Sequence, residues 1–186
     1  MNDNSKRELL GIARKSIEDA IYKKEDINII CDNHELQGKQ GVFVTLKNSG
    51  KLRGCLGHFE SDIPLYKLVA QTAVSSATDD SRFVFDRITS EEVDDINIEI
   101  SVLSQLKKID NPLDIELGVH GIYIKKGFKL GCFLPQVALE TGWSKEEFLS
   151  NCCYGKAGLH SDAWKDNDVE IFVFTAEIFN EKELSL

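Results

Sequence analysis

Hydrophobic residues recur every three to four positions near the start of the chain. In residues 5–23 the recurring apolar positions are Leu9, Ala13, Ile17 and Ile21. This spacing places them on one face of a predicted helix. Ser5 and Glu8 have the spacing of a capping box, so the helix is expected to begin at Ser5.

Three later segments show similar helical patterns. Residues 61–77 predict a helix with Pro64 in its first turn, and residues 134–142 and 144–153 predict two shorter helices. The residues expected to begin or end these helices are Ser61 or Asp62 for the first, Gly142 for the second, and Ser144 with Glu147 for the third.

Other segments have the composition and period of β-strands. GVFVTL and KLRGCLGH flank Asn48-Ser49-Gly50, which predicts a hairpin because glycine can adopt positive φ. GIYIKKGFKLGCF predicts a second hairpin about Lys126-Gly127, and VEIFVFTAEIF is β-rich throughout. In INIEISVL, apolar residues alternate with mostly polar ones as in a half-buried strand; the apolar positions are Ile96, Ile98, Ile100 and Val102.

The order of these elements favours one fold class. Helices and strands are mixed without regular alternation and hairpins recur, which indicates an α+β fold with mainly antiparallel sheets and flanking helices. No proline-rich or low-complexity linker interrupts the chain. We therefore expect a single domain over residues 1–186, made of two closely packed subdomains that no linker separates.

Charge and composition limit the function classes. A net charge of -9 opposes binding to a phosphate backbone, so we expect no nucleic-acid partner. We find no signal peptide and no apolar run of membrane-spanning length, which predicts a cytoplasmic protein without a membrane partner. Five cysteines cannot all pair, and in a reducing compartment they are expected to be free thiols. The sequence contains no dinucleotide or phosphate-loop motif, and we expect no cofactor.

Several motifs together resemble one family. GVFVTL, LRGCLG, Arg82-Phe83, IEISVLS, HGI, LPQVA and KAGL occur in an order and spacing similar to those of the AMMECR domain family, over about residues 7–180. The resemblance implies a two-part α+β domain without an assigned biochemical function. It also implies, as partners, a Memo-like protein and a radical-SAM protein in the three-part AmmeMemoRadiSam system. Two departures from the family pattern, DDSRF and CCYGKAGL, affect the positions of Arg82 and Lys156.

Cys55 in the LRGCLG motif is the first candidate for a catalytic residue. In an extended strand, Arg53, Cys55 and Gly57 lie on one face. A guanidinium near a thiol favours the nucleophilic thiolate, and Gly54 and Gly57 would let a substrate or another backbone approach. The alternative is structural, because free cysteine is often buried and glycines mark tight backbone contacts.

A catalytic group would need further residues. His58 points away from Cys55 in a regular strand, so His120 of the HGI motif is the preferred base and Glu99 the orienting carboxylate. Cys55, His120 and Glu99 together would suit acyl or amide transfer. Arg53, Gly54, Gly57, Arg82 and Lys156 are the expected ligand-binding residues.

Two other functions compete with this hypothesis. Cys31 with His34, and Cys55 with His58, have a spacing compatible with zinc ligands, but neither pair adjoins a second one in sequence, and we predict no metal site. The same motifs could instead form a non-catalytic adaptor that receives a protein partner or a small molecule. In an adaptor, replacing Cys55 by serine would preserve partner binding, whereas in an enzyme it would abolish turnover.

Overall fold

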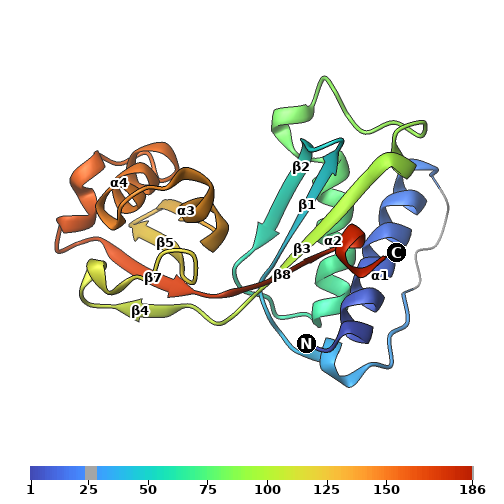
Figure 1. Ribbon diagram of the computed structural model, residues 1–186, viewed down its shortest axis with the longest axis horizontal. Coiled ribbons are helices and arrows are strands. Elements are labelled where there is room, and N and C mark those ends of the chain that lie inside the picture. Colours follow the sequence, from blue (N-terminus) through green and yellow to red (C-terminus); the bar gives the residue numbers. More distant parts are fainter. Residues whose placement is uncertain (24–28, 186) are drawn as a thin grey trace. The chain divides into compact units, whose positions relative to one another are not determined.

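The computed structural model describes residues 1–23 and 29–185 and divides into two compact units (Figure 1). The first comprises Met1–Val102 and Glu177–Leu186, and the second comprises Leu103–Ala176. Each unit has a four-stranded antiparallel sheet and its own apolar core. The α+β fold expected from the sequence is confirmed.

The first unit has the sheet order β2-β1-β3-β8. Its strands are β1 (Val42–Asn48), β2 (Lys51–His58), β3 (Ile96–Leu103) and β8 (Ala176–Asn180). Its helices are α1 (Asp3–Ile21), α2 (Leu65–Thr78) and the short α5 (Glu181–Leu184), with 3-10 turns at His34–Gln37, Ser81–Phe83 and Val93–Asp95. Helices α1 and α2 cover one face of this sheet (Figure 1).

The core of the first unit follows from strand alternation. Val44 and Leu46 of β1 and Ile98 and Ile100 of β3 are fully buried and share one apolar cluster with residues of α1 and α2. Burying one such side chain contributes about 1.5–3 kcal/mol. The opposite face, which we call the outer face, carries Phe43, Thr45 and Lys47 of β1 and the residues paired with Phe43 and Thr45 on β2 and β3.

Two predicted helix caps are wrong. Helix α1 begins at Asp3, and the side chain of Asn2 accepts a hydrogen bond from the Ser5 amide at 2.9 Å. Ser5 therefore lies inside the helix, and its hydroxyl accepts from Asn33 at 3.0 Å. The cap of α2 is Pro64, without a side-chain cap bond, so neither Ser61 nor Asp62 caps it.

The β1–β2 hairpin forms where it was predicted. Ser49 and Gly50 connect the strands with φ of 49° and 80°, the two positive values that a tight hairpin turn needs. The register shifts between Leu46 and Lys47, whose partners are Gly54 and Leu52. Arg53 is thus the extra residue of a β-bulge, a feature that simple alternation along β2 did not predict.

The second unit has the sheet order β4-β7-β5-β6. Its strands are β4 (Lys107–Ile109), β5 (Gly121–Lys126), β6 (Lys129–Phe133) and β7 (Glu170–Phe174). Its helices are α3 (Pro135–Thr141) and α4 (Lys145–Gly155), with 3-10 turns at Pro112–Asp114 and Ser161–Lys165. The predicted ends are confirmed: Gly142 ends α3 with φ of 65°, and Ser144 and Glu147 form a capping box at the start of α4.

Candidate functional site

The LRGC motif lies on β2, at the edge of the first sheet. A side chain at Gly54 would clash with the carbonyl oxygen of Ser76 in α2, so this position faces the helices. Its neighbour Cys55 faces the other way, toward the outer face. Gly54 therefore allows β2 and α2 to pack closely. The Ser76 backbone fills the space beside Gly54, so no room for a ligand remains there.

Cys55 belongs to a row of polar side chains that crosses three strands. Thr45 of β1 pairs in register with both Cys55 of β2 and Glu99 of β3. The Thr45 hydroxyl donates a hydrogen bond to the Cys55 sulfur at 3.2 Å, and Lys47 Nζ lies 3.2 Å from Glu99 Oε2. The structure thus brings two predicted site residues onto one face and adds Thr45 and Lys47, which the sequence analysis had not identified.

The distance across this row limits its chemistry. Neighbouring strands are about 4.8 Å apart, so Cys55 and Glu99, which are two strands apart, are separated by about 10 Å between backbones. Glu99 is paired with Lys47 and its side chain is only 16% exposed. Cys55 is a half-buried residue, and its sulfur accepts a hydrogen bond from Thr45. Glu99 therefore balances the charge of Lys47, and Cys55 contributes the sulfur atom of the row.

The backbone of Cys55 is fixed by an ion pair. Its amide donates to Asp80 Oδ2 at 2.9 Å, and its carbonyl oxygen accepts from Arg82 Nη2 at 3.0 Å. Arg82 also pairs with Asp80 at 2.6 Å, and this guanidinium lowers the pKa of Asp80 to about 2. Asp80 and Arg82 bind the outward-facing backbone groups of an edge strand, where an additional strand would otherwise pair.

Arg53 is held by two other carboxylates. Its Nε lies 2.6 Å from Glu92 Oε1, and its Nη1 lies 2.7 Å from Asp86 Oδ2. The guanidinium lowers the pKa of Glu92 below its ordinary value. Arg53 was expected to activate the thiol, but its charge is balanced by Glu92 and Asp86, and the hydrogen bond to the sulfur comes from Thr45.

Gly57 and Phe83 complete the surroundings of the motif. A side chain at Gly57 would overlap the ring of Phe43, so this glycine makes room for an aromatic side chain of the neighbouring strand. The ring of Phe83 lies 5.8 Å from Arg53 Cζ and 5.7 Å from Arg82 Cζ. Both arginines thus contact one aromatic ring, which links the motif to the segment after α2.

His120 and Lys156 belong to the second unit. His120 Nδ1 accepts a hydrogen bond from the Glu116 amide at 3.1 Å, and the His120 amide donates to the Glu116 carbonyl at 2.8 Å. Lys156 caps the end of α4, and its Nζ lies 5.8 Å from the centre of the Phe133 ring. Because Cys55 and Glu99 lie in the first unit, the catalytic group of Cys55, His120 and Glu99 stays a prediction.

Cys31, from the first of the two cysteine-histidine pairs, lies in the apolar core of the first unit. Cys31 is buried and donates a hydrogen bond to Glu8 Oε1 at 3.4 Å; burial raises the pKa of its thiol. Within residues 1–23 and 29–185, no group of three or more His, Cys, Asp or Glu side chains is arranged to hold a metal ion. In the same ranges, no helix has the length and apolar character needed to cross a membrane.

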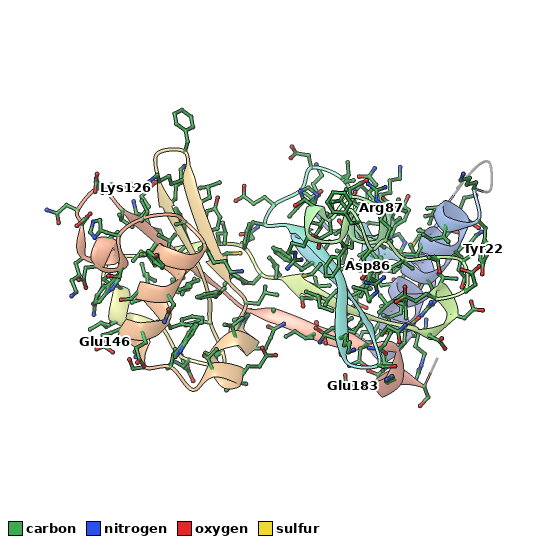
Figure 2. All side chains as sticks on the ribbon, turned by 90° about the horizontal axis from the view of Figure 1, so that it is seen from above. Tyr22, Asp86, Arg87, Lys126, Glu146 and Glu183 are labelled. Carbon is green, nitrogen blue, oxygen red and sulfur yellow. The ribbon has the colours of Figure 1, made fainter. Side chains whose placement is uncertain are left out.

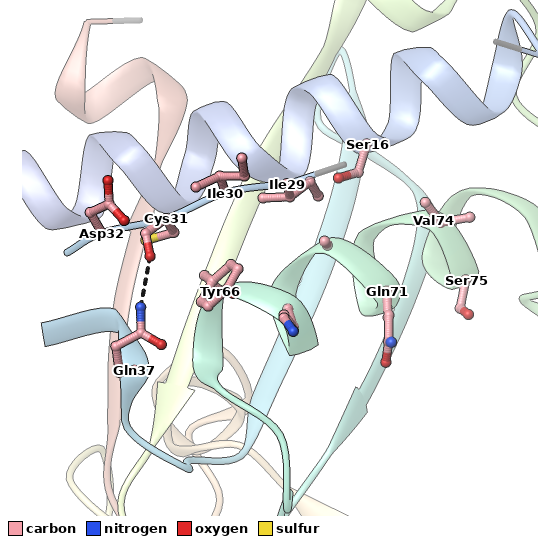
Figure 3. A pocket seen from close by; sticks show the side chains of 12 residues that line it. Ser16, Ile29, Ile30, Cys31, Asp32, Gln37, Tyr66, Gln71, Val74 and Ser75 are labelled. Atoms are coloured by element: carbon pink, nitrogen blue, oxygen red, sulfur yellow. Dashed lines mark hydrogen bonds between the residues drawn. The ribbon is translucent and has the colours of Figure 1, made fainter. Parts of the chain in front are cut away.

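A groove in the first unit was not predicted from the sequence (Figure 3). It has a volume of about 890 Å³ and runs between α1, α2 and residues 29–32. Tyr66 and Gln71 line it from α2, and Gln37 donates to the Cys31 carbonyl at 2.8 Å beside it. No cluster of like charges faces this groove, so its lining does not define a ligand class.

The sequence matches the AMMECR1 family over residues 10–179. The chain belongs to the AMMECR1 family. Among its AMMECR1 relatives, protein MK0488 of Methanopyrus kandleri is 43% identical, with 94% of this chain and 87% of the relative covered. Protein PYRAB00100 of Pyrococcus abyssi is 40% identical, with 94% and 89% covered.

The family fold is also seen in a crystal structure. The uncharacterized protein PH0010 of Pyrococcus horikoshii is 39% identical and superimposes with a TM-score of 0.86, covering 94% of this chain and 90% of that chain. At this identity the likeness extends to both the fold and the family. It assigns no reaction, because PH0010 is itself described as uncharacterized.

Proposed function

We propose that this AMMECR1 protein binds a small acyl-bearing molecule at the outer face of its first sheet and uses Cys55 as the nucleophile in acyl or amide transfer. The observation that carries the proposal is the row of Cys55, Thr45 and Glu99 across β2, β1 and β3. The row combines a half-buried cysteine with a hydroxyl donor 3.2 Å from its sulfur, at a backbone position fixed by Asp80 and Arg82.

The reaction would proceed in two steps. The Cys55 thiol loses its proton to solvent, and its sulfur attacks the acyl carbon; a C–S bond forms while the bond to the leaving group breaks. The leaving group departs with that electron pair and takes up a proton. Water then hydrolyses the thioester, which releases the carboxylic acid and restores the thiol. A fixed Cys55 backbone favours this attack because it restricts where the sulfur can lie.

The hydrogen bond to His120 determines which ring nitrogen of the neutral side chain carries the proton. Because its Nδ1 accepts from the Glu116 amide, the neutral ring carries its proton on Nε2. Such a ring donates a hydrogen bond from Nε2 but cannot accept a proton there. For His120 to act as a base, the hydrogen bond from the Glu116 amide would have to break, and this role stays a prediction.

The proposal is tested with p-nitrophenyl acetate as the acyl donor. Wild type is expected to release p-nitrophenol in a burst followed by turnover, and Cys55→Ser is expected to lose both. Cys132→Ser is the matched control, because Cys132 is the other partly exposed thiol and lies in the second unit. Equal rates for Cys55→Ser and wild type would refute the proposal.

An adaptor role is the second candidate, and one observation favours it. Arg53 and Arg82 are both paired with carboxylates, so the family motif has an evident structural use without any reaction. In that case the partners would be the Memo-like and radical-SAM proteins that the family resemblance implies. Calorimetric titration with a purified Memo-like protein tests the adaptor role: wild type and Cys55→Ser should bind it equally well, and an absence of binding by both would count against this role.

A further inference from the structure

An aromatic ring lies beside Cys55 on the outer face of the first sheet. Val42 and Val44 of β1 are fully buried in the apolar core, so Phe43 between them points to the outer face, where it is half-buried. Thr45, the next outer-face residue of this strand, donates the hydrogen bond to the Cys55 sulfur. Phe43 is thus the aromatic neighbour of the residue that contacts the thiol.

The Phe43 ring extends across β2, over the backbone of Gly57. The two residues are partners in the strand register, and a side chain on Gly57 would overlap the ring. Gly57 lies two residues from Cys55 on the same face of β2, which is about 7 Å along the strand. Phe59 packs edge-on against the ring, with 5.3 Å between the two ring centres. These contacts hold an apolar ring on the Gly57 side of the thiol.

The opposite side of the thiol is charged. Toward the hairpin turn, β2 carries Arg53, which pairs with Asp86 beside this strand at 2.7 Å (Figure 2). On β1, Lys47 also lies toward the turn and pairs with Glu99 at 3.2 Å. An apolar group attached to the thiol is therefore more stable toward the aromatic ring, because apolar surface leaves water there, whereas beside the ion pairs it would displace water from charged groups.

We propose that Phe43 selects the acyl group that Cys55 accepts, and that the substrates are esters or thioesters of apolar acyl chains longer than acetyl. The chain packs on the Phe43 ring over Gly57, and the leaving group lies toward the charged side. In this step the thiolate sulfur bonds to the acyl carbon, and the leaving group departs with its electron pair and takes up a proton. Such selection rests on the proposed function, since Cys55 must first accept an acyl group.

A ring over a glycine also has a structural use, because it covers a strand backbone that carries no side chain. A purely structural Phe43 would affect folding but not the choice between two acyl chains. The ratio of the rates with two esters separates these roles. Both rates come from the same protein sample, so any loss of folded protein cancels in the ratio.

The test uses the full chain with p-nitrophenyl acetate and p-nitrophenyl hexanoate. For each protein the rate of the p-nitrophenol burst is corrected by the rate of the same protein carrying Cys55→Ser, and the hexanoate rate is divided by the acetate rate. N-acetylcysteine in the same buffer gives the ratio for a free thiol. Wild type is compared with Phe43→Ala, Phe43→Leu and the matched control Phe128→Ala, because Phe128 is 105% exposed and lies in the second unit.

The wild-type ratio is expected to exceed that of N-acetylcysteine by about 10-fold or more, since each methylene group that leaves water contributes about fourfold. Phe43→Ala should bring the ratio close to the free-thiol value, whereas Phe43→Leu and Phe128→Ala should keep most of it. A wild-type ratio equal to that of the free thiol, or an unchanged ratio in Phe43→Ala, would overturn the role of Phe43 and leave acylation of Cys55 standing. If mass spectrometry finds no acyl group on Cys55 with either ester, the proposed function and the selection by Phe43 both fail.

Discussion

Arg82 donates a hydrogen bond to the carbonyl oxygen of Cys55 at 3.0 Å. The same guanidinium pairs with Asp80, which accepts from the Cys55 amide. The motif LRGC and the later DDSRF are separated by a helix in sequence. They therefore form one hydrogen-bonded cluster at the edge of the first sheet. Asp80 and Arg82 thereby hold the backbone of the proposed thiol site.

Asp80→Asn should destabilise the protein by about 2 kcal/mol, because the side chain of Asp80 is buried and accepts charge-assisted hydrogen bonds. Urea denaturation followed by circular dichroism measures this loss. Asp162→Asn is the control, since it removes an exposed pair with Lys165 and should change stability by less than about 0.5 kcal/mol. Equal losses for the two variants would contradict the assigned role of Asp80.

Stability should fall in acid, and Asp80 accounts for part of the decrease. Its pKa is about 2 in the folded protein, below the ordinary aspartate value of 3.8. A carboxyl group with a depressed folded-state pKa stabilises the protein above its unfolded pKa, and this contribution is lost as pH falls from about 5 toward 2. The difference in unfolding free energy between wild type and Asp80→Asn should therefore shrink from pH 6 to pH 3. A constant difference would mean that the Asp80 charge does not matter.

Gly54→Ala should destabilise the first unit strongly, by about 2–4 kcal/mol, because the new methyl group would meet the Ser76 backbone in α2. Gly11→Ala is the matched control. Gly11 lies inside α1 with open space where a side chain would be, so alanine should stabilise the helix by about 0.5–1 kcal/mol. Thermal denaturation of both variants tests whether β2 and α2 pack as described; a mild effect of Gly54→Ala would argue against it.

The five cysteines should differ in their reaction with iodoacetamide. Cys55 and Cys132 are partly exposed and should be alkylated in the native protein, whereas Cys31, Cys152 and Cys153 are buried. Burial also raises the pKa of Cys153 to about 11 and that of Cys152 further. Peptide mapping after brief alkylation at pH 8 measures the pattern. Rapid labelling of Cys152 before unfolding would contradict the described core of the second unit.

Local patterns predicted most of the fold. The alternation of Ile96, Ile98 and Ile100 indicated β3, and Ser144 with Glu147 indicated the start of α4, because each signal depends only on neighbouring residues. Strand β4 was missed, since its three residues, Lys107–Ile109, are mainly exposed and charged. The start of α1 was predicted too late, because asparagine and serine are equally good N-cap residues and Asn2 takes this position in place of Ser5.

The candidate site was harder to predict because its contacts join distant segments. Alternation correctly placed Cys55 and Gly54 on opposite faces of β2, but the bulge at Arg53 depends on how β1 and β2 pair. Asp80 was not identified as a partner of Cys55, since a single acidic residue after a helix carries no signal for a strand 25 positions earlier. Thr45 was missed for the same reason: only the register of the hairpin shows that it faces Cys55.

The most direct test of the proposed function is the mass of the Cys55 peptide after the protein has reacted with p-nitrophenyl acetate and been quenched in acid within the burst. The account predicts an acetyl group on Cys55 that disappears on further incubation and none on Cys132 in the same sample. An unmodified Cys55 throughout a complete burst, or an acetyl group that never leaves, would contradict turnover at this thiol.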